Sequence, residues 1–204
     1  MSVISLKNIT AAYGNKDVLM HFNLEIARGE FVMLIGTSGC GKTTALKLMN
    51  GLLTPEQGTV TINGTDISRT DINELRRGIG YVIQEIGLFP HMTIEKNISY
   101  VPNLYKSPDK AAIAARARQL AGTVGLDTDM LKRYPSELSG GQRQRVGIAR
   151  ALMNSPKIIL MDEPFGAVDE ITRRRLQEEI LRIHEELGGT IVFVTHDIKE
   201  ALKL

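Results

Sequence analysis

A glycine-rich run with one lysine and one threonine is the most informative stretch of the chain. It consists of Gly36-Thr37-Ser38-Gly39-Cys40-Gly41-Lys42-Thr43 and fits the pattern G-x-x-x-x-G-K-[ST]. Glycines let the backbone curl so that its N–H groups point at phosphate oxygens, and a helix start adds further donors. Lys42 would bring positive charge to the β- and γ-phosphates, and the Thr43 hydroxyl would bind Mg²⁺. These residues predict a site for a nucleoside triphosphate.

The elements around this loop must hold it in place. An apolar run from Phe31 to Ile35 predicts a buried strand before the loop, and residues 44–50 predict a helix after it. The alternative is a glycine-rich turn that matches the pattern by chance. A preceding strand and a following helix are the context that a phosphate-binding loop requires, so we favour that interpretation. We include Thr44, in the first turn of the helix, among the binding residues.

Two adjacent acidic residues follow a second apolar run. Residues 158–161 predict a central strand, and Asp162 and Glu163 come directly after it. Beside a phosphate-binding loop, an acid at a strand end can hold Mg²⁺, and we assign this role to Asp162. Glu163 could polarise a water for attack on the γ-phosphate. The alternative is an exposed acidic turn before Pro164.

A third candidate is the segment Leu138-Ser139-Gly140-Gly141-Gln142. A hydroxyl, two flexible glycines and free N–H groups before a helix make a start that can receive an anion. An ordinary N-cap preceded by a loop is the alternative interpretation.

The composition is that of an ordinary globular domain, with 43% apolar and 24% charged residues among 204. A net charge of +2 is too small to indicate a nucleic-acid surface, so we expect no nucleic-acid partner. Apolar runs stay well short of the roughly 18 residues that span a bilayer, so a membrane role would need a partner protein. Cys40 is the only cysteine, which excludes an intramolecular disulfide and fits a reducing cytoplasm.

Strand-like and helix-like segments alternate at both ends of the chain, with a mainly helical stretch between them. The predicted strands cover residues 3–9, 18–26, 31–35, 59–64, 79–83, 158–161 and 190–195. The predicted helices cover residues 44–50, 72–77, 93–100, 108–124, 142–153 and 170–187, and another starts near 197. We therefore predict an α/β fold in which residues 1–86 and 155–204 form the core and residues 87–154 form an inserted helical subdomain.

The segment Leu138 to Gln142 matches the signature sequence of the ATP-binding cassette (ABC) ATPases, and nearly the whole chain resembles that family. The resemblance implies a P-loop NTPase fold of the ABC type, with an antiparallel β subdomain and a helical subdomain. It also implies ATP hydrolysis with ATP and Mg²⁺ as ligands. Two copies would close head to tail, so that each ATP lies between one P-loop and the partner's signature residues. Those residues are Ser139, Gly140, Gly141 and Gln142.

The resemblance also implies roles for two residues near strand ends. Tyr13 resembles the aromatic residue that stacks on adenine; the alternative is a tyrosine at the edge of the core. Gln84 resembles the Q-loop glutamine, which reaches Mg²⁺ and the attacking water and senses the transmembrane partner. A glutamine in a solvated loop is the alternative, and its place between P-loop and signature argues against that.

Two further residues complete the implied site. His196 resembles the switch histidine that contacts the γ-phosphate, although a lone histidine is more often a structural hydrogen-bonding residue. Asp169 resembles the D-loop aspartate, but Gly166 and Val168 depart from the commoner Ser-Ala-Leu-Asp. The implied catalytic set is therefore Glu163 and His196 together with the Q-loop glutamine.

The segments 79–93, 134–137 and 161–167 resemble the importer branch for quaternary-ammonium osmoprotectants such as glycine betaine, carnitine and choline. In that branch the segment after the Q-loop glutamine faces an integral-membrane permease, which places the ATPase on the cytoplasmic face of the membrane. The candidate contact residues are Phe89, Pro90 and His91. The alternative is that they form a buried aromatic anchor for the helical subdomain.

Other functions remain open at this point. One is an ABC importer ATPase for another substrate, such as amino acids. Another is a soluble ABC ATPase that acts on DNA or ribosomes without a permease, and a third is a non-hydrolysing module gated by ATP. The chain stops at Leu204 inside a predicted helix, whereas family members continue. We therefore expect a fragment of a longer protein that lacks part of the sheet edge and any C-terminal regulatory module.

Overall fold

The computed structural model describes residues 2–13 and 16–204, and the turn predicted at Gly14-Asn15 lies outside the described residues. The chain divides into two compact units. The first consists of Met1–Tyr81, Lys157–Asp162 and Gly188–Leu204, and the second of Val82–Pro156 and Glu163–Leu187. The predicted helical subdomain over residues 87–154 differs from the second unit mainly in the segment 163–187, and its boundaries stay a prediction.

The first unit contains an antiparallel sheet with the strand order β2-β1-β4-β5. Its strands are β1 (Ser2–Tyr13), β2 (Lys16–Ala27), β4 (Gln57–Ile62) and β5 (Thr65–Asp66). Both β1 and β2 extend beyond their predicted ends because they pair along nearly their whole length, with several β-bulges. Ile4 and Leu6 of β1 are fully buried, and Val3 before them and Ser5 between them are buried too, so this part of the strand is covered on both faces.

A second sheet with the order β3-β8-β7-β6 carries the strands that lead to the candidate site. These are β3 (Phe31–Ile35), β8 (Thr190–Thr195), β7 (Ile158–Asp162) and β6 (Ile79–Val82). The pairs β3–β8 and β7–β8 are parallel. All residues of β7 and β8 are buried, which explains why these strands are continuous apolar runs rather than alternating ones.

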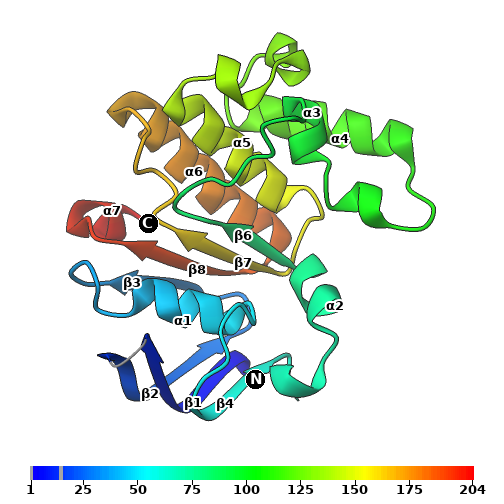
Figure 1. Cartoon of the computed structure of the whole chain (residues 1–204). Helices are drawn as coiled ribbons and strands as arrows, with labels where there is room; N and C mark the ends of the chain where they lie inside the picture. The colour runs from blue at the N-terminus through cyan, green and yellow to red at the C-terminus, as the bar shows by residue number, and fades with distance from the viewer. Residues whose placement is uncertain (1, 14–15) are drawn as a thin grey trace. The chain divides into compact units, whose positions relative to one another are not determined.

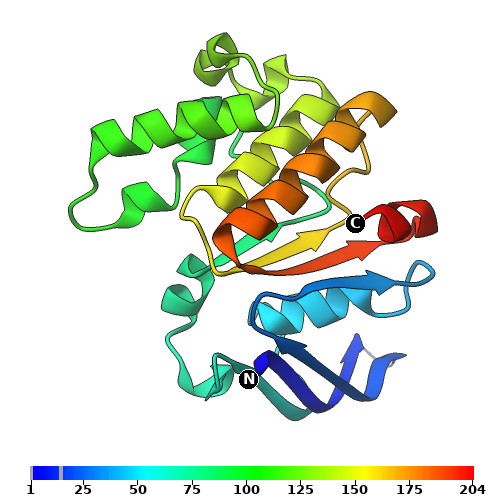
Figure 2. The same ribbon diagram turned by 180° about the vertical axis from the view of Figure 1, so that it is seen from behind.

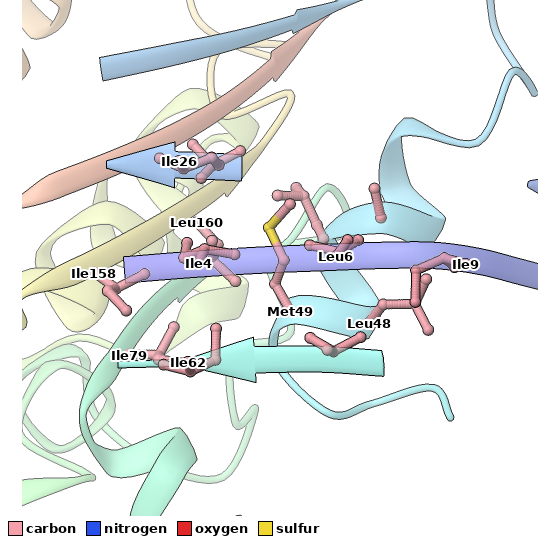
Figure 3. Packing of buried hydrophobic residues seen from close by; sticks show 14 of the residues in the cluster. Ile4, Leu6, Ile9, Ile26, Leu48, Met49, Ile62, Ile79, Ile158 and Leu160 are labelled. Atoms are coloured by element: carbon pink, nitrogen blue, oxygen red, sulfur yellow. The ribbon is translucent and has the colours of Figure 1, made fainter. Parts of the chain in front are cut away.

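Helix α1 (Lys42–Met49) lies between the two sheets (Figure 1, Figure 2). Its Leu48 and Met49 pack among apolar side chains from both sheets, as Figure 3 shows. The neighbours include Leu6 of β1 and Leu160 of β7. The same core therefore fixes the helix that follows the P-loop and the strand that ends at Asp162. Also in this unit are α2 (Ile72–Arg77), the short helix η1 (Ile67–Arg69) and α7 (Ile198–Lys203).

The second unit is helical. Helix α5 packs against α3 and α4, and α6 runs beside α5 (Figure 1, Figure 2). Its α-helices are α3 (Ile94–Ile98), α4 (Lys110–Thr123), α5 (Gly140–Leu152) and α6 (Glu170–Leu187). Short 3₁₀ helices connect them: η2 (Pro102–Leu104), η3 (Thr128–Lys132) and η4 (Pro135–Glu137).

Several element ends differ from the predictions for local reasons. Helix α3 starts after Thr93, whose hydroxyl accepts the Lys96 N–H, and it ends early, at Ile98. Helix α5 starts two residues earlier than predicted, because Ser139 caps it. Gly140 and Gly141, which were predicted to precede the helix, are therefore its first two residues.

Gly58 allows β4 to approach β1 closely at a bulge. Its φ is +93°, and a Cβ there would lie 2.4 Å from the backbone oxygens of Lys7 and Asn8. We expect Gly58→Ala to lower the free energy of unfolding by about 3 kcal/mol, from the left-handed backbone and the clash together. Urea unfolding measures the loss. Gly64→Ala is the matched control, because its φ is +78° with nothing within 4 Å of the new carbon. Equal losses in both variants would contradict the role of the close approach.

Candidate active site

The phosphate-binding loop connects β3 to α1 in the first unit. Gly41 occupies the N-cap position of α1 with a φ of +100°, and it has no side chain that could cover the helix start. A Cβ at Gly36 would lie 2.7 Å from the Cys40 sulfur, and one at Gly41 would lie 2.8 Å from Leu19. The central residues Thr37, Ser38 and the following glycine are exposed. The exposed centre of the loop therefore lies directly before the start of α1, the positive end of the helix dipole, as an anion site requires.

Lys42 and Thr44 lie in the first turn of α1 but point in different directions. The Lys42 ammonium donates to the backbone oxygens of Gly36, at 2.7 Å, and Thr37, at 2.9 Å. The ammonium thus stabilises the loop. A bound phosphate could replace these two carbonyl oxygens as the acceptor of its hydrogen bonds. The Thr44 side chain is only 5% exposed, so its backbone N–H is the group that can reach a phosphate.

Thr43 and Asp162 meet at the start of the same helix. The Thr43 hydroxyl donates to Asp162 Oδ1 at 3.0 Å, and Asp162 is 2% exposed at the end of β7. The described part of the chain holds no cluster of three or more His, Cys, Asp or Glu side chains suited to a metal ion. Mg²⁺ fits this pair, because it prefers hard oxygen ligands and commonly uses one or two carboxylates with waters and phosphate oxygens.

His196 follows the neighbouring strand. Strands β3, β8 and β7 are parallel, with Ile35 opposite Thr195 and Asp162 opposite Val194. Their carboxyl ends therefore lie along one edge of the sheet, where α/β proteins bind ligands. His196 is exposed at this edge, directly after Thr195. The structure thus brings the P-loop, the Asp162 carboxylate and His196 to one end of the first unit.

Glu163, the first residue of the segment Glu163–Leu187, has an unusual backbone conformation. It is partly buried and has a φ of +46°, a left-handed conformation that costs a non-glycine residue about 1–2 kcal/mol. Its backbone oxygen accepts from the Gly166 N–H at 3.3 Å and from the Gln144 side chain at 3.1 Å. The side chain of this candidate base is therefore oriented by a constrained turn.

The signature segment forms a reciprocal cap on α5. The Ser139 hydroxyl accepts the Gln142 N–H at 3.2 Å, and the Gln142 side chain accepts the Ser139 N–H at 2.8 Å. This is a capping box. A Cβ on Gly141 would lie 3.0 Å from the Ala167 oxygen. Gly141 therefore permits a close backbone approach between α5 and the segment after Glu163, in addition to any role towards a ligand.

Gln84 is exposed just after β6, at the start of a loop with two consecutive left-handed residues. These are Ile86, with a φ of +57°, and Gly87, with a φ of +54°. The Arg150 guanidinium of α5 donates to both backbone oxygens, at 2.6 and 2.8 Å. Burial lowers the pKa of Arg150, although a guanidinium stays charged at physiological pH. Sequence reasoning missed Arg150, which has no local motif to reveal it.

Phe89, Pro90 and His91 form the next turn. The Phe89 ring is half-buried, with its centroid 4.5 Å from that of Tyr100, whereas Pro90 and His91 are exposed. A fully buried amide, Asn97, holds the turn. Its oxygen accepts the Phe89 N–H at 2.8 Å, and its nitrogen donates to the backbone oxygens of Phe89, Met92 and Thr93.

Asn97 was missed by sequence reasoning, but the sequence holds a signal for it. It lies on the buried face of α3 together with Ile94 and Ile98. An amide at an apolar position of an amphipathic helix must find dedicated hydrogen-bond partners. Gln144 occupies the same kind of position on α5, one turn before Ile148.

The two remaining predicted residues lie at the ends of elements. Tyr13 ends β1 with its backbone opposite Lys16; its predicted contact with adenine stays a prediction. Asp169 precedes α6, and its carboxylate accepts the Thr172 N–H at 3.0 Å. This hydrogen bond holds the pKa of Asp169 below its usual value. In this chain Asp169 therefore acts as a helix cap, and its predicted D-loop role stays a prediction.

Comparison with known proteins decides the family. A model of the ABC transporter family matches residues 19–166, which include the P-loop, the signature segment and the two adjacent acids. The chain belongs to the ABC transporter family. The predicted family resemblance is thereby confirmed. None of the described helices of this family member is both long and apolar enough to cross a membrane.

Similar curated proteins include several ATP-binding proteins of bacterial uptake systems. Choline transport ATP-binding protein OpuBA of Bacillus subtilis is 53% identical over 99% of this chain and 53% of its own length. Glycine betaine/carnitine/choline transport ATP-binding protein OpuCA of the same organism gives the same identity and coverage. Glycine betaine uptake system ATP-binding protein YehX of Escherichia coli is 48% identical over 99% of this chain and 65% of its own. The chain thus spans about half the length of the first two.

Solved structures confirm the predicted fold class. A dimeric ATP-binding cassette in a post-hydrolysis state, bound to ADP and Pi, is similar with a TM-score of 0.91 and 37% identity. The match covers 98% of this chain and 90% of that one. A dimeric bacterial ABC transporter cassette gives a TM-score of 0.92 and 38% identity, with the same coverage.

Proposed function

We propose that the protein is the ATP-hydrolysing subunit of a membrane ABC importer for quaternary-ammonium osmoprotectants such as glycine betaine, carnitine or choline. The observation that carries the ATPase part is the Thr43–Asp162 hydrogen bond at a helix start that also bears Lys42. The relatives support the proposed class of transported substrate, because their names include choline, carnitine and glycine betaine. An importer ATPase for another substrate, or a soluble ABC ATPase, is the alternative.

In this proposal the first unit binds ATP. The loop N–H groups and Lys42 hold the phosphates, and Tyr13 stacks on adenine. The Thr43 hydroxyl and the Asp162 carboxylate hold Mg²⁺. When bound there, the ion would supply positive charge against the charge that develops on the transferred phosphoryl group. His196, at the same edge of the sheet, donates a hydrogen bond to the γ-phosphate.

In the same proposal, two further residues act on water. Glu163 accepts a proton from the attacking water, and Gln84 orients that water and contributes to the Mg²⁺ shell. A second copy of the chain brings its signature segment to the γ-phosphate. The Ser139 hydroxyl accepts one hydrogen bond within the capping box and can still donate its hydrogen. Closure of the two copies excludes water, and loss of the γ-phosphate reopens them.

The membrane partner in this proposal is an integral-membrane permease that docks on the turn with Phe89, Pro90 and His91. The exposure of Pro90 and His91 supports this role, and Phe89 combines it with packing against Tyr100. The ATPase then works on the cytoplasmic face of the membrane.

Phosphate release from ATP tests the ATPase part of the proposal. The purified protein is expected to hydrolyse ATP with Mg²⁺ and to stop when EDTA removes the metal. ATP bound without turnover would instead favour a module that ATP gates but that does not hydrolyse it.

Asn97→Leu tests the docking turn. The change removes the side-chain bonds to four backbone groups of the turn. The oxygens of Phe89 and Thr93 keep the N–H groups of Met92 and Asn97 as donors, whereas the Phe89 N–H and the Met92 oxygen lose their side-chain partner, at about 1–3 kcal/mol for each buried group. We expect recovery of the permease to fall at least about fivefold in a tagged pull-down from solubilised source membranes, at unchanged ATP binding.

Asn103→Leu is the control, because Asn103 is exposed and its amide donates to the Ser99 oxygen rather than to the turn. Full recovery of the permease by Asn97→Leu would contradict docking through this turn. Recovery of nucleic acid or ribosomes in place of a membrane protein would overturn the proposal that the protein serves an importer.

A further inference from the structure

Gln144 has a buried side-chain amide, and no sequence motif assigns a role to it. It lies on α5, five residues after Ser139, and is 2% exposed. Its nitrogen donates to the Glu163 backbone oxygen at 3.1 Å, and its oxygen accepts the Ala167 N–H at 2.8 Å. One side chain therefore satisfies a donor and an acceptor at the two ends of the segment from Glu163 to Ala167.

The segment that Gln144 holds is constrained elsewhere too. Glu163 has a φ of +46°, which residues with a side chain rarely adopt. Such a conformation persists only where the surrounding structure over-determines it. The Gly166 N–H also donates to the Glu163 oxygen, at 3.3 Å, and Gly141 lets the Ala167 oxygen approach α5. The Gln144 bonds are the only ones of these that come from a side chain, so substitution can remove them selectively.

We propose that Gln144 is a positioning residue for hydrolysis: it holds the Glu163 backbone so that the carboxylate points at the attacking water. The inference rests on the proposed role of Glu163 as the base. General base catalysis requires the carboxylate within hydrogen-bond reach of the water, and small misplacements are costly. Because α5 begins at the signature segment, the same amide ties the orientation of the base to that helix.

Gln144→Met tests the inference, since it nearly keeps the volume and removes both hydrogen bonds. We expect kcat for ATP hydrolysis to fall by about 10- to 100-fold. KM, and the affinity for a fluorescent ATP analogue, are expected to stay within about twofold, because the P-loop contacts are untouched. Gln144→Glu is the second variant; it keeps an acceptor for the Ala167 N–H and loses the donor to the Glu163 oxygen, so its kcat should also fall.

Two control variants separate positioning from stability. Gln119→Met makes the same chemical change at an exposed position of α4, and Ile148→Val removes a methylene from the buried face of α5. Both are expected to keep the wild-type kcat once unfolded protein is subtracted by urea titration. A loss of kcat in Gln144→Met no larger than that in Ile148→Val at matched stability would overturn the inference.

The double variant Gln144→Met/Glu163→Gln shows whether Gln144 acts through Glu163. It should be no slower than Glu163→Gln alone, whereas losses that multiply would overturn the inference. If Glu163→Gln itself leaves turnover unchanged, the base role in the proposed function fails, and the inference with it. If Glu163→Gln abolishes turnover and both Gln144 variants turn over normally, the inference alone fails.

Discussion

Glu163→Gln is expected to lower kcat for ATP hydrolysis by about 100-fold or more while ATP still binds. The amide keeps the shape of the side chain but cannot accept a proton from water. ATP should therefore persist in the closed state, and a dimer should accumulate with ATP and Mg²⁺. Phosphate release gives the rate, and light scattering after size exclusion gives the mass of the ATP-bound species.

Glu186→Gln is the matched control for this prediction. It removes the same charge from an exposed position near the end of α6, where the carboxylate pairs with Arg182. Its turnover should equal that of the wild type. Wild-type turnover by Glu163→Gln would remove Glu163 from the role of base, and the rest of the site would then need another proton acceptor.

Lys42→Ala is expected to weaken ATP binding by about 100-fold, because it removes a charged hydrogen-bond donor to the phosphates. It also removes the two hydrogen bonds that brace the loop against the Gly36 and Thr37 oxygens. Titration with a fluorescent ATP analogue measures the affinity, and ADP should lose less than ATP because it lacks the γ-phosphate.

Lys7→Ala gives the same change in net charge at an exposed position of β1, where the ammonium lies 3.8 Å from Glu25. An exposed pair of this kind contributes little, so neither affinity nor stability should change appreciably. If the two variants bind ATP equally well, the P-loop lysine does not hold the phosphates.

The fold class could be predicted because its signals are local. The segment from Phe31 into α1 consists of a continuous apolar run, a glycine-rich pattern and a helix start. Each of these signals depends on neighbouring residues only. The same holds for β7, whose apolar run ends in Asp162 and Glu163. Parallel strands buried on both faces are continuous apolar runs, so they stand out in a sequence. The family signature segment is local as well.

The ends of helices and the functions of individual glycines were harder to predict, because they depend on contacts with other residues. The capping box of Ser139 and Gln142 draws Gly140 and Gly141 into α5, although two glycines in succession favour a loop. Gly58 resembles any other turn glycine in the sequence, but its close approach to Lys7 and Asn8 exists only because β1 pairs with β4.

The family, the strand–loop–helix of the phosphate site and the acids after β7 can be recognised from the order of residues along the chain. How these groups are held depends on the fold. The Thr43–Asp162 bond joins residues 119 positions apart. Gln144 and Arg150 bond to backbone oxygens 19 and 64 positions away, and Asn97 holds a turn that begins eight residues before it. The physical reason is that motifs record groups close in the chain, whereas buried amides and guanidinium groups bond to backbone oxygens and N–H groups that every residue carries. A sequence can mark such a side chain as buried, but only the folded chain shows which backbone groups it holds.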